Sequence, residues 1–157
     1  MTKAELRVLR AQLLAERSRL QQVAAQLAAL DSSLQGRTPT VVELMAAGGF
    51  LHNVYNGIEN CMSRLAHGID ESVPTGSDSH RLLLDQLSVP IPSLRPSLLN
   101  PDLATRIDEL RRFRHAFRHM YLFDLEWARL QPLVTAAPAL LLDFERAIDD
   151  LLVQLGA

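Results

Sequence analysis

A chain of 157 residues, of which 48% are apolar, is long enough to bury a normal core, and this composition excludes an intrinsically disordered protein. The formal net charge of −2 excludes polyanion binding by bulk charge, so contact with nucleic acid would require a local patch. Cys61 is the single cysteine, which excludes an internal disulfide and a four-cysteine zinc site.

Charge spacing at the start of the chain argues against export. Charged residues interrupt residues 1–20 every few positions, so this segment lacks the apolar core of a signal peptide. Elsewhere no apolar run approaches the roughly 20 residues that cross a membrane. We therefore expect a cytoplasmic protein with no membrane partner.

Apolar residues spaced three and four apart dominate the chain and predict helices. The expected helices cover residues 2–35, 39–68, 79–88, 101–123 and 126–155. No alternating strand pattern is longer than four residues. The sequence thus predicts an all-α protein of about five helices in one domain over 1–157, with a long N-terminal helix over 1–36 and a helical core over 38–157.

Local signals mark the ends of the first two helices. The leucine stripe of the first helix has heptad-like spacing, is broken once by Glu16, and ends at Gly36. Thr38 and Pro39 are typical of a helix cap and a first helical position. The stripe suits a coiled-coil partner, but packing within the chain's own bundle is the interpretation we favour.

Prolines punctuate the second half of the chain. Turn residues before the short third helix, and three prolines over 88–100 after it, predict loops on both sides. Asn100 is the expected cap of the fourth helix, and Asp124 is a candidate cap for the fifth. Pro132 and Pro138 are expected to kink or split that last helix.

Arginine is concentrated in the predicted fourth helix. Five of the sixteen basic residues fall close together, at Arg106, Arg111, Arg112, Arg114 and Arg118. His115 and His119 are interleaved with them, and only Asp108 and Glu109 oppose them nearby. Such a cluster is usually a solvated helix face, but it also suits a phosphate-binding groove or a polar subunit interface.

Helical geometry, at about 100° per residue, separates these side chains into two groups. Measured from the apolar centre of the helix, Arg114 lies at about +60° and Tyr121 at about +40°, at the edge of the apolar arc. His115 and His119 lie nearly opposite the core. An arginine at the edge of the core requires a partner, and Glu59 on the second helix is a candidate.

The two histidines also permit a metal site, because they are four residues apart on one helix. Asp108 is the local residue that could supply a third ligand, and Arg112 would repel the cation. We therefore expect neither a metal ion nor another cofactor.

The residues from Arg114 to Tyr121 read R-x4-H-x-Y. This string resembles the signature of HepT-type toxins, which belong to the HEPN superfamily of helical ribonucleases. The polar residue directly after the arginine, His115, also fits the superfamily pattern. Further segments resemble HepT-like proteins, namely residues 52–59, Val73-Pro74 with Gly76, His80 before Leu83-Leu84, residues 94–96 and residues 110–115. The resemblance extends from about residue 45 to about residue 133 and continues into a helical tail.

The resemblance implies an up-and-down helical bundle that forms a homodimer, with a ribonuclease site in the cleft between protomers. Arg114 and His119 are then the catalytic residues. Other basic residues of the same helix would support RNA binding, namely Arg111, Arg112, His115 and Arg118. The resemblance also implies a type VII-like toxin–antitoxin pair whose second member is a minimal nucleotidyltransferase. That antitoxin can silence the toxin by adenylylating the motif tyrosine, here Tyr121.

These residue types suit metal-independent cleavage of an RNA such as tRNA or mRNA. The 2′-hydroxyl attacks the adjacent phosphorus while a histidine exchanges protons near neutral pH, and the products are a 2′,3′-cyclic phosphate and a 5′-hydroxyl. An arginine holds the phosphate and its developing charge through paired hydrogen bonds.

The site and the function each have an alternative. Arg114 and His119 point about 140° apart on an ideal helix, so either the helix distorts or residues of two protomers combine. Arg112, seven residues before His119 and on the same face, is the alternative motif arginine. The alternative function is a non-catalytic HEPN-fold subunit that binds or scaffolds, dimerises, and partners a nucleotidyltransferase.

Overall fold

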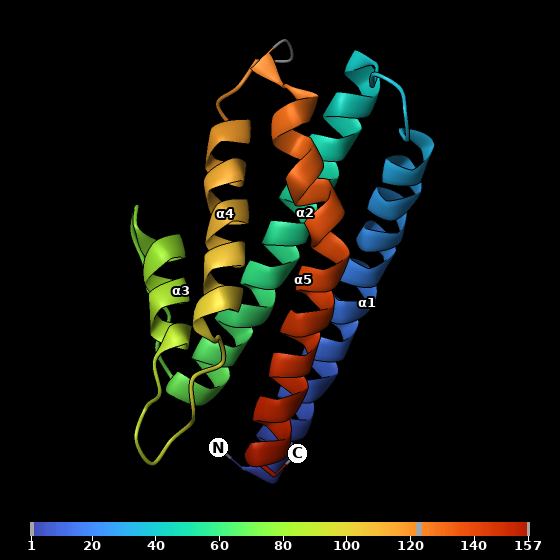
Figure 1. Cartoon of the computed structure of the whole chain (residues 1–157). Coiled ribbons are helices and arrows are strands. Elements are labelled where there is room, and N and C mark those ends of the chain that lie inside the picture. Colours follow the sequence, from blue (N-terminus) through green and yellow to red (C-terminus); the bar gives the residue numbers. More distant parts are fainter. Residues whose placement is uncertain (1, 122–123, 157) are drawn as a thin grey trace.

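Four long helices alternate in direction and form the body of the molecule (Figure 1). The computed structural model describes residues 2–121 and 124–156. In this part of the chain the elements are α1 (Lys3–Ser33), α2 (Val41–Leu65), η1 (Ala66–Asp70), α3 (Ser79–Ser88), α4 (Pro101–Phe117) and α5 (Trp127–Gln154). Five are α-helices, η1 is a π-helical turn that continues α2, and no strand forms among the described residues. The predicted all-α fold is therefore confirmed.

The long helices are arranged up and down. α2 returns beside α1, and α4 and α5 repeat this pattern, so that α5 packs against α1 and α2 while α4 packs against α2 and α5 (Figure 1). The short α3 lies on the outside, against α2 and α4. The start of α1 and the end of α5 lie at one end of the bundle, whereas the end of α4 lies at the other (Figure 1).

The leucine stripe of α1 packs inside the bundle, as the favoured interpretation predicted. Leu13 and Leu27 are buried, and α2 is the main neighbour of α1. Glu16, which breaks the stripe, is buried as well; its carboxylate accepts a hydrogen bond from Asn60 Nδ2 at 3.1 Å and lies 3.4 Å from Arg19 Nη1. These two partners explain how a carboxylate occupies a position that faces the core.

The start of α2 differs from the prediction. The cap is Thr40 rather than Thr38, and the first helical residue is Val41 rather than Pro39. The Glu43 backbone N–H donates to Thr40 Oγ1 at 3.3 Å, and the Thr40 backbone N–H donates to the Glu43 carboxylate at 2.8 Å. This reciprocal pair satisfies two backbone donors. If the helix began with Thr38 as its cap, the residue three positions later would be Val41, whose side chain cannot accept a hydrogen bond from the Thr38 backbone N–H.

The second helix also continues beyond its predicted end at residue 68. The π-helical turn η1 carries it to Asp70, and Glu71, with a φ of 53°, ends it in the left-handed conformation. Asp70 is thereby placed at the end of the helix, where its carboxylate faces the proline-rich loop that leads to α4.

A buried arginine in that loop fixes the end of α2. The Arg95 guanidinium is 0% exposed and binds the Asp70 carboxylate through Nε at 2.6 Å and Nη2 at 2.7 Å. Its remaining N–H groups donate to the backbone carbonyls of Gln86, Val89 and Pro96. All five donors of the guanidinium have acceptors, so the loop is ordered, as the sequence predicts.

The short third helix and the start of the fourth are confirmed. α3 covers residues 79–88, as the apolar spacing indicates. Asn100 Oδ1 accepts a hydrogen bond from the backbone N–H of Leu103 at 2.8 Å, and Pro101 is the first helical residue. Asparagine followed by proline is therefore a sufficient start signal here.

The predicted end of the fourth helix is wrong. α4 stops at Phe117 rather than near residue 123. The backbone N–H of His119 donates to the carbonyl of Ala116 at 3.0 Å, three residues back, and this tighter turn leads the chain out of the helix. Met120 still packs against the core from the non-helical segment. The apolar spacing consequently extends past the true end of the helix.

The last helix departs from the prediction in two ways. The residue at its cap position is Glu126 and not Asp124. The carboxylate of Asp124 instead accepts a hydrogen bond from the backbone N–H of Tyr121 at 3.2 Å. Pro132 and Pro138 lie inside one continuous helix, so the expected interruption is wrong. Both prolines are on the exposed side of α5, and the buried side packs against the bundle and holds the helix together across them.

The long helices carry charged residues along their length. No helix in the described part of the chain is both long enough and apolar enough to span a membrane.

Candidate functional site

The basic stretch at the end of α4 presents its side chains in two directions. Arg114 is half-buried at the edge of the core, whereas His115 and His119 are exposed, as the helical geometry predicts. Arg112 is exposed on the outer side of α4, and Arg118 is exposed just after the helix ends. The stretch therefore has one inward-turned arginine and an outer basic surface.

A hydrogen-bonded chain of three side chains connects Arg114 to α2. Arg114 Nε donates to Asn56 Oδ1 at 2.8 Å, and Asn56 Nδ2 lies 2.9 Å from His52 Nε2. Because the amide oxygen of Asn56 accepts from Arg114, its NH2 group is the donor to His52, and Nε2 must be unprotonated. The neutral tautomer of His52 therefore carries its proton on Nδ1.

The environment of His52 favours this neutral form. Burial lowers the pKa of His52 below its ordinary value of 6.5, and the positive charges of Arg114 and Arg118 lower it further. Its Nδ1 is buried and has no hydrogen-bond partner among the described residues. A neutral imidazole at this position does not repel Arg114.

An aromatic ring also lies close to the guanidinium of Arg114. The carbon Cζ of Arg114 is 5.5 Å from the centre of the Tyr55 ring, which is a cation–π distance. Tyr55 is fully buried, and burial is the main cause that raises the pKa of its hydroxyl. Among the described residues, no carboxylate lies within ion-pair distance of Arg114. Arg114 is thus held by neutral groups and forms no ion pair in the described part of the chain.

Glu59 is not the partner of Arg114 that the sequence suggested. Its carboxylate pairs instead with Nδ1 of His80, on α3. Asn56, one turn earlier on α2, takes the place expected for Glu59. The arrangement depends on α3, whose first turn brings His80 to the glutamate.

Asp108 is shared between two arginines. Its carboxylate lies 2.6 Å from Arg111 Nε and 2.7 Å from Arg112 Nη2. The rings of His115 and His119 are 5.3 Å apart between centroids. Asp108 is therefore not available to complete a metal site with the two histidines, and no group of three metal-ligating side chains occurs in the described part of the chain.

A close contact between α2 and α4 fixes the position of this end of α4. A Cβ atom at Gly48 would lie 2.5 Å from Cε2 of Phe117, so the glycine lets the phenylalanine ring lie against the backbone of α2. The Phe117 ring lies 5.5 Å from that of Phe113 and 6.0 Å from that of His52. These contacts fix the position of α4 along α2, so that Arg114 lies beside Asn56.

Tyr121 lies outside the helix, which corrects the expected position at the edge of the core. Its side chain is 73% exposed, and its backbone carbonyl accepts a hydrogen bond from the Asp124 N–H at 3.0 Å. The helix end at Phe117 explains the difference, because the angular position calculated for Tyr121 assumes a continuous helix.

Arg114 and His119 do not contact each other within the described chain. α4 ends between them, Arg114 turns toward α2, and His119 is exposed beyond the helix. In the described residues no hydrogen bond or ring contact links the two side chains. The helix ends between them instead of continuing, so the separation of about 140° on an ideal helix does not describe their relative positions.

Sequence reasoning assigned no role to His52 and Asn56. The signal that could have identified them is their spacing of four residues, which places two polar side chains on one face of α2 beside its buried stripe. Both lie within the segment 52–59 that resembles HepT-like proteins.

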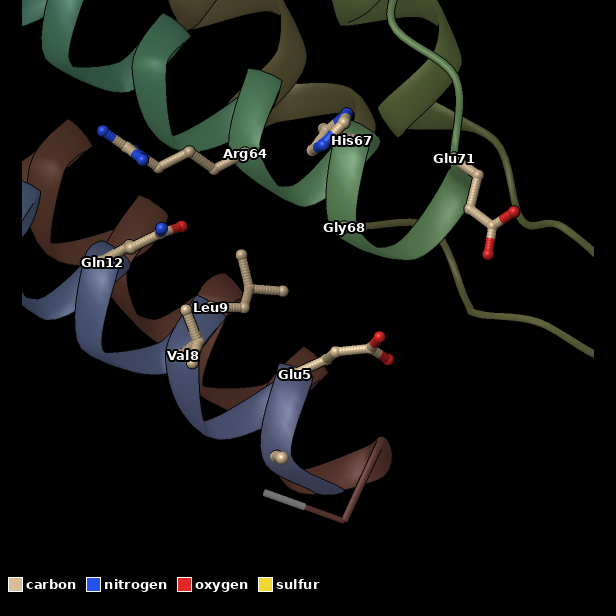
Figure 2. A pocket seen from close by; sticks show the side chains of 9 residues that line it. Glu5, Val8, Leu9, Gln12, Arg64, His67, Gly68 and Glu71 are labelled. Atoms are coloured by element: carbon tan, nitrogen blue, oxygen red, sulfur yellow. The ribbon is translucent and has the colours of Figure 1, made fainter. Parts of the chain in front are cut away.

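A separate cavity lies away from the arginine-rich stretch. It measures about 700 Å³ and lies between the start of α1 and the end of α2, where Val8 and Leu9 face Arg64, His67 and Gly68 (Figure 2). It contains none of the residues predicted for the site. The candidate site is therefore defined by the chemistry of the arginine-rich helix and not by cavity size.

A model of the family described as HepT-like protein matches residues 46–155. The chain belongs to the HepT-like family. The matched segment includes most of α2 and all of α3, α4 and α5, so the HepT-like part contains Asn56, Arg114 and His119, while α1 lies outside it. No curated protein and no solved structure matches the chain.

Proposed function

We propose that this HepT-like protein is a metal-independent endoribonuclease and the toxin of a type VII-like pair of the HEPN and minimal nucleotidyltransferase kind. The observation that supports this function best is the state of Arg114. Its guanidinium is oriented by Asn56 and Tyr55, both neutral, and no carboxylate compensates its charge among the described residues. A fixed, uncompensated cation is what a phosphodiester in the act of cleavage requires.

The chemistry assigned to the site needs no cofactor. The 2′-oxygen of the RNA forms a bond to the adjacent phosphorus while the bond from phosphorus to the 5′-oxygen breaks. His119 exchanges the proton that leaves the 2′-hydroxyl or the proton that the 5′-oxygen receives, and Arg114 stabilises the charge that develops on the phosphate oxygens. The products are a 2′,3′-cyclic phosphate and a 5′-hydroxyl.

The working unit in this proposal is a homodimer. Within one chain Arg114 turns toward α2 and His119 lies beyond the end of α4, so a composite site would take the arginine from one protomer and the histidine from its partner. The exposed or half-buried basic residues around them would contact the RNA strand, namely Arg111, Arg112, His115 and Arg118.

The proposed protein partner is a minimal nucleotidyltransferase that adenylylates Tyr121. The 73% exposed side chain of Tyr121 is accessible to such an enzyme, and Tyr121 follows the arginine-rich stretch directly. An adenylate there would add negative charge next to the arginines that bind phosphate, and would compete with RNA.

The decisive experiment is cleavage of tRNA and mRNA by the purified protein in the presence of EDTA. We expect fragments that end in a 2′,3′-cyclic phosphate, identified by mass spectrometry, and no such fragments from Arg114→Ala. If the wild-type protein cleaves none of the RNAs with or without divalent cations, the nuclease function is refuted.

One observation favours a second candidate function, a non-catalytic binding or scaffolding subunit. Arg114 and His119 do not contact each other within the described chain, so no contact within one protomer supports the proposed pair of catalytic residues. Under this alternative the protein dimerises and binds a nucleotidyltransferase but leaves RNA intact.

A further inference from the structure

A basic cavity lies beside Arg114, between the start of α3 and α4, with a volume of about 180 Å³. The chain around the start of α3 lines one side with Ser77, Asp78, His80 and Arg81. The opposite side is lined by Arg111, Arg114 and His115 of α4. The volume is about six times the ~30 Å³ that one water molecule occupies in the liquid, enough for an anionic group and its hydration.

Positive charge exceeds negative charge around this cavity. Its lining has three arginines against one carboxylate, that of Asp78. Asp108, the carboxylate that pairs with Arg111, is shared with Arg112, which leaves one of these two guanidinium charges uncompensated. Arg114 adds a second cation without a carboxylate partner among the described residues.

The ion pair of Arg81 leaves this arginine available to a ligand. Arg81 Nη1 lies 3.2 Å from Asp85, and both side chains are more than half exposed, at 55% and 59%. Exposed pairs of this kind contribute little free energy, so a phosphate can replace the aspartate at small cost. His80 is already paired with Glu59, which leaves Arg81 as the α3 residue best suited to bind the anion.

The composition of the lining indicates which part of an RNA would bind. Phenylalanine, tyrosine and tryptophan are absent from it, so no large ring is present on which a base could stack. Guanidinium groups bind phosphate oxygens through paired hydrogen bonds and carry no information about base identity.

We propose that this cavity is a second phosphate-binding subsite, in which Arg81 and Arg111 hold the backbone phosphate next to the one bound by Arg114. The proposal rests on the ribonuclease function proposed above, because Arg114 belongs to both sites. It assigns a role to α3, which brings Arg81 across from α4. Binding there is independent of base sequence and dependent on salt.

The test uses a 2′-O-methylated RNA oligonucleotide, which cannot be cleaved at its modified positions, and fluorescence anisotropy at several salt concentrations. Arg81→Ala should raise the Kd by on the order of three- to tenfold, and should reduce the slope of log Kd against log salt by about 0.7, the value for one phosphate contact with a single strand. Arg81→Glu should weaken binding further.

The matched control is Arg146 on α5, which is also exposed and also paired with an aspartate of its own helix, Asp143, but lies outside the cavity. Arg146→Ala and Arg146→Glu should leave the Kd within about twofold of wild type. The subsite is refuted if Arg81→Glu binds RNA like Arg146→Glu, or if wild-type protein fails to bind the oligonucleotide. If wild-type protein binds it in the Arg81-dependent way but cleaves no unmodified RNA, the subsite is supported and the nuclease function fails.

Discussion

Arg114 Nε on α4 donates a hydrogen bond to Asn56 Oδ1 on α2 at 2.8 Å, so a neutral amide sets the direction of the least compensated cation in the arginine-rich helix. A carboxylate at position 56 would bind the same guanidinium as an ion pair and neutralise it. The choice between amide and carboxylate at one position of α2 therefore determines whether Arg114 can act on an anionic ligand.

The first prediction follows from this contact. Asn56→Asp should pair with Arg114 and lower the rate of RNA cleavage by on the order of 10²-fold, because the arginine is no longer available to the phosphate. The melting temperature should change little, since the ion pair to Arg114 replaces one hydrogen bond and His52 can restore the other by carrying its proton on Nε2 and donating to the new carboxylate. Single-turnover cleavage and thermal unfolding measure the two effects.

Asn53→Asp is the matched control for Asn56→Asp. Asn53 is exposed, lies one turn earlier on α2 and undergoes the same change of charge. It should keep most of the cleavage activity. Equal losses in the two variants would mean that general charge, rather than the contact with Arg114, is responsible.

The second prediction concerns the proposed catalytic pair. Arg114→Ala should reduce cleavage by on the order of 10²- to 10³-fold and weaken RNA binding, because it removes a cation aimed at phosphate. His119→Ala should reduce cleavage by on the order of 10²- to 10⁴-fold and leave RNA binding nearly intact, because it removes a group that exchanges protons. Neither variant should unfold, since neither side chain is fully buried.

Mixing the two inactive variants tests whether the site is shared between protomers. If Arg114 and His119 come from different subunits, mixed dimers regain one intact site, and the mixture should recover about one quarter of wild-type activity. If both residues act within one subunit, the mixture stays inactive. Retained activity in both single variants, together with its loss in Arg112→Ala and His115→Ala, would instead identify Arg112 as the motif arginine.

The third prediction concerns the protonation of His52. Burial and the charges of Arg114 and Arg118 lower its pKa, so NMR titration should give a value below the ordinary 6.5 and a neutral ring protonated on Nδ1. Arg114→Ala should raise this pKa. The folded protein binds this proton more weakly than the unfolded chain does, so the contribution of His52 to stability falls as the pH drops below 6.5. A proton on Nε2 at neutral pH would contradict the hydrogen-bond assignment.

Much of the fold could be predicted because the signals that set it are local. The leucine stripe of α1 and the Asn100-Pro101 start of α4 depend on neighbouring residues only, and both are confirmed. The end of α4 could not be placed, because Met120 continues the apolar spacing from outside the helix. Apolar periodicity reports contact with the core and not the backbone conformation that produces the contact.

The partner of Arg114 could not be predicted because it depends on long-range packing. Asn56 and Glu59 are three residues apart on α2, and both are within reach of an arginine on a neighbouring helix. His80 binds the Glu59 carboxylate, which leaves Asn56 as the partner of Arg114. The position of His80 in turn depends on the path of the loop between η1 and α3. The exposed position of His115, by contrast, follows from helical geometry alone, because His115 lies inside α4.

The fourth prediction concerns modification by a nucleotidyltransferase. Co-expression with a cognate enzyme should add one adenylate to Tyr121, detected by mass spectrometry of the intact protein and its peptides, and the modified protein should bind RNA more weakly. Tyr121→Phe should abolish the mass increase. Tyr55, the other tyrosine of the chain, is an internal control because it is fully buried and should stay unmodified. An unchanged mass for wild-type protein would remove the support for this regulation.

The fifth prediction concerns stability. Arg95→Ala should lower the free energy of unfolding by about 3–5 kcal/mol, because it leaves the Asp70 carboxylate, which is 2% exposed, buried without its ion-pair partner and with the hydrogen bond from Gln86 Nε2 only. Urea denaturation followed by circular dichroism measures the change. Arg129→Ala is the control, since Arg129 and Glu126 form an ion pair in which both side chains are well exposed, and should change stability by less than about 1 kcal/mol. Equal effects in both variants would refute a special role for the buried pair.

The up-and-down course of the helices places the start of α1 and the end of α5 at the opposite end of the bundle from the arginine-rich end of α4 (Figure 1). The 31 residues of α1 span about 46 Å at ~1.5 Å per residue, so this is the approximate distance between the two ends of the bundle. A fluorescent protein fused at either terminus, or a surface used for immobilisation, would therefore stand at the opposite end of the molecule from Arg114 and His119. Tethered binding and single-molecule measurements can use either attachment point without covering the residues that they are meant to report on.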